Sequence, residues 1–110
     1  MILKGTNISM TRGDTESLTV RCSAPFREGD MVYFTVRADP ESPIVFQKIV
    51  YQFGSAGEAV IVIDHEDTDG LDFGDYRYDV QVTRSSGTVT TLVKPARFTL
   101  TEEITYGTGA

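Results

Sequence analysis

Apolar and polar residues alternate in short runs along this chain, and turns that contain Gly, Pro, Asp or Ser separate the runs. Two of these runs, at residues 30–38 and 75–84, alternate without interruption. Such alternation is typical of strands that bury one side and expose the other. No stretch keeps its apolar residues at helical spacing. The pattern therefore predicts an all-β protein.

The spacing between the predicted strands is typical of β-sandwiches and barrels. The strands are predicted at residues 7–11, 17–23, 30–38, 45–53, 58–64, 75–84, 88–94 and 96–101. We expect an immunoglobulin-like antiparallel β-sandwich of about seven to eight strands. The run at 45–53 is less regular, because Phe46 and Val50 require one face while Ile49 and Tyr51 require the other. A bulge or an edge strand would explain it.

Two features near the end of the chain predict how the last strands are connected. Residues 85–87, Ser-Ser-Gly, predict a tight hairpin between two strands that pair. Pro95 lacks an N–H group, so we expect the chain to bend there. Residues 1–104 are expected to form a single β-sandwich domain, and residues 105–110 a flexible C-terminal tail.

Composition and charge exclude several classes of protein. The chain has 110 residues, of which 40% are hydrophobic and 24% charged, as expected for one globular domain. Its formal charge of −6 argues against binding to nucleic acid. The N-terminus shows no signal peptide, and the longest apolar run, residues 59–63, is too short to cross a bilayer. We therefore expect neither a nucleic-acid nor a membrane partner.

Cys22 is the only cysteine, which excludes an internal disulfide and fits a protein made in a reducing cytosol. It continues the apolar alternation of Leu18 and Val20. We therefore expect a buried structural thiol and not a reactive nucleophile.

The acidic segment at residues 64–75 has two interpretations. One is a calcium site, for which the candidate ligands are Asp64, Glu66, Asp67 and Asp69. The EF-hand spacing is not met, because His65 falls where the first Asp belongs and Tyr76 where the final Glu belongs. The structural interpretation, which we prefer, is that Asp67 or Thr68 caps a single helical turn.

A tyrosine corner is predicted by three residues, Leu71, Gly74 and Tyr76. Leu71 is expected to fill the core, Gly74 to supply a turn conformation, and Tyr76 to bond upstream backbone through its hydroxyl. Tyr78 then takes the place of the second immunoglobulin cysteine.

The remaining candidate motifs indicate no catalytic, cofactor or metal site. His65, the single histidine, lacks an identifiable nucleophile and orienting partner, so we expect no enzyme. Residues 12–14 spell Arg-Gly-Asp, which we interpret as a turn between the first two strands. Three aromatic residues form either an exposed binding patch or packing against a loop: Tyr33, Tyr51 and Phe53. Arg37 and Asp79 would be outward neighbours if their strands pair.

Three stretches together resemble a known kind of module. They are Ile-Ser-Met-Thr-Arg-Gly-Asp-Thr at residues 8–15, the residues Asp67-Thr68, Leu71, Gly74, Tyr76 and Tyr78-Asp79-Val80-Gln81, and Thr-Glu-Glu-Ile-Thr at residues 101–105. The combination is similar to the small immunoglobulin-like modules of phage and prophage tail and baseplate proteins, including the N-terminal domain of baseplate upper proteins. The resemblance covers most of the chain and transfers no catalytic or ligand-binding residue.

The resemblance implies a virion component that is assembled in the bacterial cytoplasm. Its expected role is that of a non-enzymatic structural or interaction module of a phage-like particle, in contact with copies of itself or with other particle proteins. A homo-oligomer is one form that this contact could take. Two alternatives stay open: a binding or adhesion module on a bacterial surface, and a small calcium-binding domain built on residues 64–75.

Overall fold

The computed structural model describes residues 2–102 of the chain. The expected tail at residues 105–110 lies outside this range. The elements in chain order are β1 (Ile2–Lys4), β2 (Asn7–Thr11), β3 (Glu16–Val20), β4 (Met31–Arg37), β5 (Ile44–Val50), β6 (Ala59–Ile63), α1 (His65–Asp69), β7 (Gly74–Thr83) and β8 (Val89–Thr101). No helix in the described range is long and apolar enough to span a bilayer.

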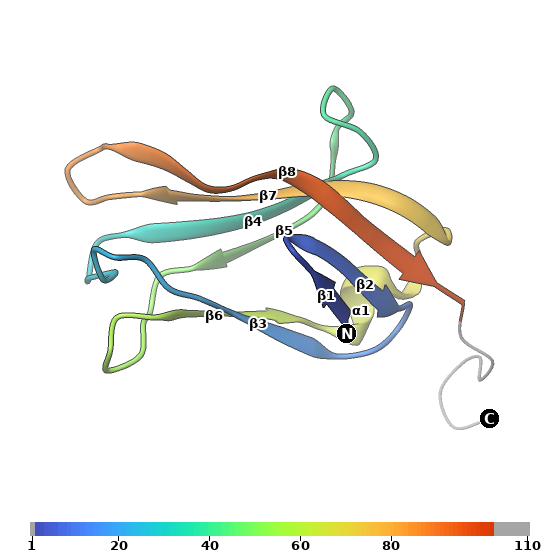
Figure 1. Cartoon of the computed structure of the whole chain (residues 1–110), viewed down its shortest axis with the longest axis horizontal. Coiled ribbons are helices and arrows are strands. Elements are labelled where there is room, and N and C mark those ends of the chain that lie inside the picture. Colours follow the sequence, from blue (N-terminus) through green and yellow to red (C-terminus); the bar gives the residue numbers. More distant parts are fainter. Residues whose placement is uncertain (1, 103–110) are drawn as a thin grey trace.

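The strands form two sheets that face each other, with α1 at one end (Figure 1). One sheet has six strands in the order β1-β2-β8-β7-β4-β5, and the other pairs β3 with β6. Neighbours pair antiparallel except β2 and β8, which run parallel. Thus β3 and β6 occupy the positions of immunoglobulin strands B and E, while β4, β7 and β8 occupy those of C, F and G. The prediction of an immunoglobulin-like β-sandwich is confirmed.

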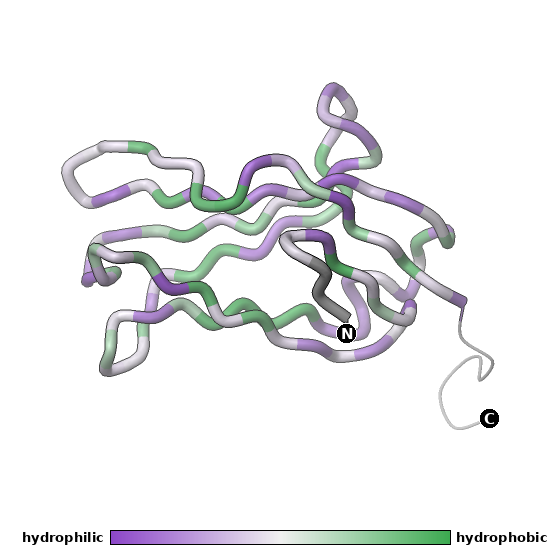
Figure 2. The backbone as a smooth tube through the Cα atoms, in the orientation of Figure 1, coloured by the Kyte–Doolittle hydropathy of each residue, from purple (hydrophilic) through white to green (hydrophobic). Residues whose placement is uncertain are grey.

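The core lies between the two sheets, where the apolar residues of the facing strands meet (Figure 2). On β4, and on β7 from Tyr78 onward, every second residue is buried, as the alternating pattern predicts. Phe34, Tyr78 and Phe98 lie at the centre of an aromatic cluster that also includes Phe46. Tyr78 is buried and its hydroxyl donates to the carbonyl of Thr6. The ring of Tyr78 thus packs against Phe34 and Phe98 on the two neighbouring strands of its own sheet.

The C-terminal strand corrects one prediction. The chain does not break into two strands at Pro95, because β8 runs without interruption from Val89 to Thr101. Pairing with β7 passes from Tyr78–Ala96 directly to Val80–Val93, so one residue of β7 faces two of β8. This bulge places Pro95 where the ladder is already irregular, and its missing N–H group is tolerated there. The sequence pattern also missed β1, which pairs with β2.

The irregular run at residues 45–53 is both an edge strand and a bulged one. In the described part of the chain β5 pairs only with β4, and the register shifts between Val36 and Arg37. Phe46 and Val50 pack against the core, while Ile49 on the other face is 44% exposed. The hairpin predicted at residues 85–87 is present, since Arg84 and Thr88 are joined by a backbone hydrogen bond of 2.8 Å.

Candidate functional site

The predicted tyrosine-corner residues come together after α1. Tyr76 is half-buried, and its hydroxyl donates to the carbonyl of Asp72 at 2.8 Å. Burial raises the pKa of Tyr76 above its usual value, and the neighbouring Asp72 raises it further. Leu71 packs against the core, and Gly74 has a φ of 129°, which an L residue rarely adopts. These residues hold the segment that leads into β7.

Replacing Tyr76 by phenylalanine is expected to lower the free energy of unfolding by about 0.5–1.5 kcal/mol, because it removes one hydrogen bond and keeps the ring. Denaturant unfolding measures this loss. Tyr51→Phe is the control, since the Tyr51 side chain is 63% exposed and its change should have no effect. A loss for Tyr76→Phe no larger than that of the control would show that the hydroxyl does not anchor this segment.

The acidic segment begins with a helical turn whose cap differs from the prediction. Asp64 is the N-cap, and its backbone N–H donates to the carboxylate of Asp67 at 2.8 Å. The prediction that Asp67 or Thr68 is the cap is wrong, because Asp67 lies at the third helical position and bonds back to the cap residue. Thr68 is fully buried inside the turn.

The ammonium group of Lys48 lies between the carboxylates of Asp64 and Asp67. Its Nζ lies 3.1 Å from Asp64 Oδ2 and 2.9 Å from Asp67 Oδ2. Burial alone would lower the pKa of Lys48, but hydrogen bonds and ion pairs with both carboxylates raise it above its usual value. Of the other calcium candidates, Glu66 faces His65 at 3.9 Å with 82% of its side chain exposed, and Asp69 is exposed. Within residues 2–102, no cluster of three or more acidic, His or Cys side chains could hold a metal ion.

The Arg-Gly-Asp tripeptide forms a turn between β2 and β3, in which the backbone N–H of Asp14 donates to the carbonyl of Thr11. The guanidinium of Arg12 donates to the carbonyl of Leu71 at 2.9 Å and lies 4.1 Å above the centre of the Phe73 ring. Arg12 thus contacts the segment between α1 and β7. These contacts give this arginine a structural role.

Cys22 corrects another expectation. It lies beyond the end of β3 and is half-buried, with its sulfur 3.7 Å from Arg84 Nη2. The alternation continues to Cys22, which packs against the core as Leu18 and Val20 do, and like them it is only partly buried.

A buried ion pair that no sequence pattern indicated lies close to Cys22. Asp30 is 4% exposed, and its carboxylate accepts hydrogen bonds from the backbone of Arg27 and Ser85 and from the guanidinium of Arg84, each at 2.9 Å. The two backbone bonds and then Arg84 lower the pKa of Asp30. The pair ties the loop before β4 to the β7–β8 hairpin.

One part of the outward side of the six-stranded sheet carries few charges, and we call it the neutral face; Arg37, Arg77 and Arg97 lie on the same side toward the other end of the sheet. Strand pairing places its side chains in adjacent rows, in which Tyr33 lies between Ile49 and Gln81. Its members are Met31, Tyr33, Thr35, Gln47, Ile49, Asp79, Gln81, Thr83, Val89 and Thr91. Asp79 is the only charged member, although 24% of the whole chain is charged. This composition sets the face apart from the rest of the surface.

Side chains of the neutral face form hydrogen bonds with one another across the strands. The amide of Gln47 donates to Thr35 at 2.9 Å, and that of Gln81 reaches Thr91 at 3.4 Å. Burial raises the pKa of Asp79, while Arg37 and a hydrogen bond from Gln81 oppose this effect. The sequence suggested Arg37 and Asp79 as neighbours, and the pairing of β4 with β7 brings them close.

A second exposed surface lies between the edge strands of the two sheets. The free edges of β5 and β6 border a groove of about 330 Å³, which we call the edge groove. Its exposed apolar members are Ile49, Tyr51, Val60 and Val62. In the described range neither edge has a further strand beside it, and an open edge can accept one. The inward-pointing charge of Lys48 and the bulge in β5 are common protections of such edges.

No family model and no curated protein matches this chain. Among solved structures, the chain is similar to the extracellular domain of the voltage-gated sodium channel β4 subunit, with 17% sequence identity and a TM-score of 0.41. The match covers 93% of this chain and 95% of that one. The extracellular domain of that channel subunit forms parallel homodimers, which explain its role in cell–cell adhesion.

The three aromatic residues Tyr33, Tyr51 and Phe53 do not share one environment, so neither an exposed patch nor packing against a loop describes all of them. Phe53 packs against Phe26, with ring centres 5.3 Å apart. Tyr51 is exposed, and Tyr33 lies half-buried on the neutral face. Nothing in the arrangement of these residues supplies reactive chemistry, but a neutral sheet face with an aromatic centre can bury against another protein at low electrostatic cost.

Proposed function

We propose that this chain is a non-enzymatic interaction module that assembles with copies of itself through the neutral face, within a phage-like particle made in the bacterial cytoplasm. The observation that carries the proposal is the composition of that face. Interfaces between proteins are depleted in Lys, Glu and Asp and enriched in Tyr and Met. The neutral face follows this composition on a chain whose formal charge is −6.

The physical argument concerns the cost of desolvation. Removing an exposed charge from water on binding costs several kcal/mol unless a partner compensates it, whereas neutral side chains with existing hydrogen bonds cost far less. Asp79 is the exception, and the nearby Arg37 offsets part of its charge. Tyr33 is the natural anchor, because buried tyrosines carry much of the binding energy at interfaces. Two copies related by a twofold axis would place this face against itself.

The phage-like setting is supported by the residues that the resemblance rests on. The turn at Arg12-Gly13 contacts the helical turn through Thr68 and the segment before Tyr76 through Leu71 and Phe73. Detection of this chain by mass spectrometry in purified tail-like particles would test the setting. Its recovery only from other cell fractions would contradict it.

Charges placed on the neutral face are expected to convert an assembly into a monomer. In the variant Gln47→Arg/Thr91→Arg, two arginines flank the centre of the face from opposite sides. Their mutual repulsion and desolvation should weaken self-association by at least about 100-fold. Light scattering on a sizing column, over a range of concentrations, measures the change.

The matched control is Ser17→Arg/Thr19→Arg, which adds the same charge at exposed positions of β3 on the other sheet. The wild type and the control should form the same discrete oligomer. A wild-type monomer at every concentration would rule out self-assembly as the role of this face. An oligomer that survives in the neutral-face variant would assign the contact to another surface, for which the edge groove is the first candidate.

A further inference from the structure

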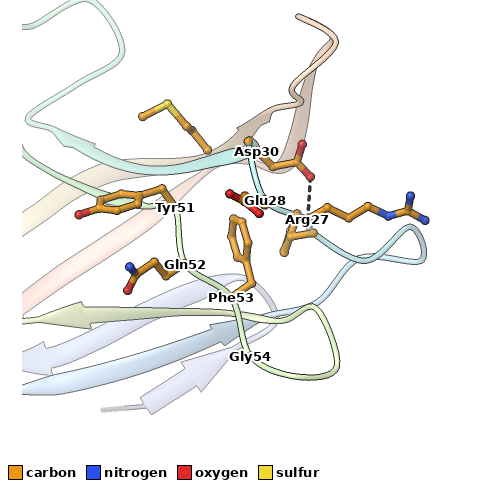
Figure 3. A pocket seen from close by; sticks show the side chains of 10 residues that line it. Arg27, Glu28, Asp30, Tyr51, Gln52, Phe53 and Gly54 are labelled. Atoms are coloured by element: carbon orange, nitrogen blue, oxygen red, sulfur yellow. Dashed lines mark hydrogen bonds between the residues drawn. The ribbon is translucent and has the colours of Figure 1, made fainter.

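A hollow at the end of the sandwich opposite α1 has no role in the proposal above, and we call it the end cleft (Figure 3). It lies between the loop before β4 and the segment that follows β5, and its volume is about 740 Å³. Protein ligand sites commonly have volumes of about 300–1,000 Å³. The end cleft is thus large enough for a side chain and the backbone that carries it.

The walls of the end cleft are aromatic and apolar. The rings of Phe26 and Phe53 pack together at its base, Met31 lines one side, and Tyr51 stands at its margin with 63% of its surface exposed. The guanidinium of Arg84 already lies 5.2 Å from the centre of the Phe26 ring. Aromatic faces attract cations, so the exposed ring of Tyr51 offers a contact for a positively charged side chain.

The charged side chains that line the end cleft differ in their direction and in their hydrogen bonds. The carboxylate of Asp30 is fully engaged by Arg84 and two backbone N–H groups. The side chain of Arg27 extends away from the hollow (Figure 3). Glu28 is exposed, and its carboxylate makes no hydrogen bond or ion pair with any residue that the structure describes. Glu28 and Phe53 both line the cleft (Figure 3).

We infer that the end cleft binds a basic side chain, arginine or lysine, presented by a partner protein. The unengaged carboxylate of Glu28 pairs with the cationic head, while the rings of Tyr51 and Phe53 contact its apolar stem. This inference is independent of the neutral face, since the two surfaces use different residues apart from Met31 at their border.

A titration followed by amide chemical shifts tests the inference on the whole chain. The probe is N-acetyl-arginine amide, and its matched control is N-acetyl-citrulline amide, which has nearly the same shape without the charge. The arginine probe should give saturable shifts at Gly29, Gln52 and Gly54, with the citrulline probe at least about tenfold weaker. Equal binding of the two probes, or no saturable shift with the arginine probe, would overturn the inference.

Two variants assign the charge recognition to one carboxylate. Glu28→Gln should weaken binding of the arginine probe by up to about fivefold, because it removes the charge of an exposed ion pair and keeps the side-chain shape. Glu41→Gln removes an exposed charge from the loop between β4 and β5, outside the cleft, and should leave binding unchanged. The same spectra report whether each variant is folded. Undiminished binding by Glu28→Gln would also overturn the inference.

Discussion

Replacing Phe98 by alanine is expected to lower the free energy of unfolding by about 3–5 kcal/mol. Phe98 is completely buried, and its ring contacts Phe34, Phe46 and Tyr78 at centre distances between 5.9 and 6.4 Å. Alanine would remove all three ring contacts and leave a cavity between the two sheets. A domain of this size is stable by about 5–15 kcal/mol, so the loss would be a large part of the total. Denaturant unfolding measures it.

Phe73→Ala is the matched control for this variant. Phe73 is 43% exposed and contacts the guanidinium of Arg12, so its removal should cost about 1 kcal/mol or less. If Phe98→Ala does not fold, Phe98→Leu fills part of the cavity and should show a smaller loss in the same direction. A loss for Phe98→Ala equal to that of Phe73→Ala would contradict the central place of the aromatic cluster.

The strands were predictable because their information is local. On β4 and β7 every second residue is apolar, and this period alone fixes which side chains face the core. The bulge around Pro95 was not predictable, since it depends on how β8 pairs with β7 and not on β8 alone. The cap at Asp64 was visible in principle, because an acid stands three residues later at Asp67.

The candidate surfaces were harder to predict than the fold. The pair of Asp30 and Arg84 joins residues 54 positions apart, and no spacing rule connects them. The neutral face has a weak signal in the sequence, since only the outward positions Met31, Tyr33 and Thr35 of β4 and Gln81 and Thr83 of β7 are uncharged. That these positions adjoin Gln47, Ile49 and Thr91 depends on the order of the strands in the sheet. Pairing of distant segments, and not local pattern, creates both surfaces.

The same dependence on distant contacts explains the acidic segment. Asp64 and Asp67 look like metal ligands in the sequence, but the fold brings Lys48 from β5 between them. Next to them, the Thr68 hydroxyl accepts a hydrogen bond of 2.9 Å from the backbone N–H of Gly13. The α1 turn is thus joined to β5 on one side and to the β2–β3 turn on the other. Its charges and its buried threonine hold three segments together.

Replacing Thr68 by valine is therefore expected to lower the free energy of unfolding by about 1–3 kcal/mol. Thr68 is completely buried, and valine has nearly its shape, so packing is kept while the N–H of Gly13 loses its acceptor. Thr68→Ser keeps the hydroxyl, loses a methyl group, and restores this N–H partner. Denaturant unfolding should rank valine below wild type, and amide hydrogen exchange at Gly13 should be faster in the valine variant but not in the serine variant. Wild-type exchange at Gly13 in the valine variant would show that the α1 turn and the β2–β3 turn are held together by other contacts.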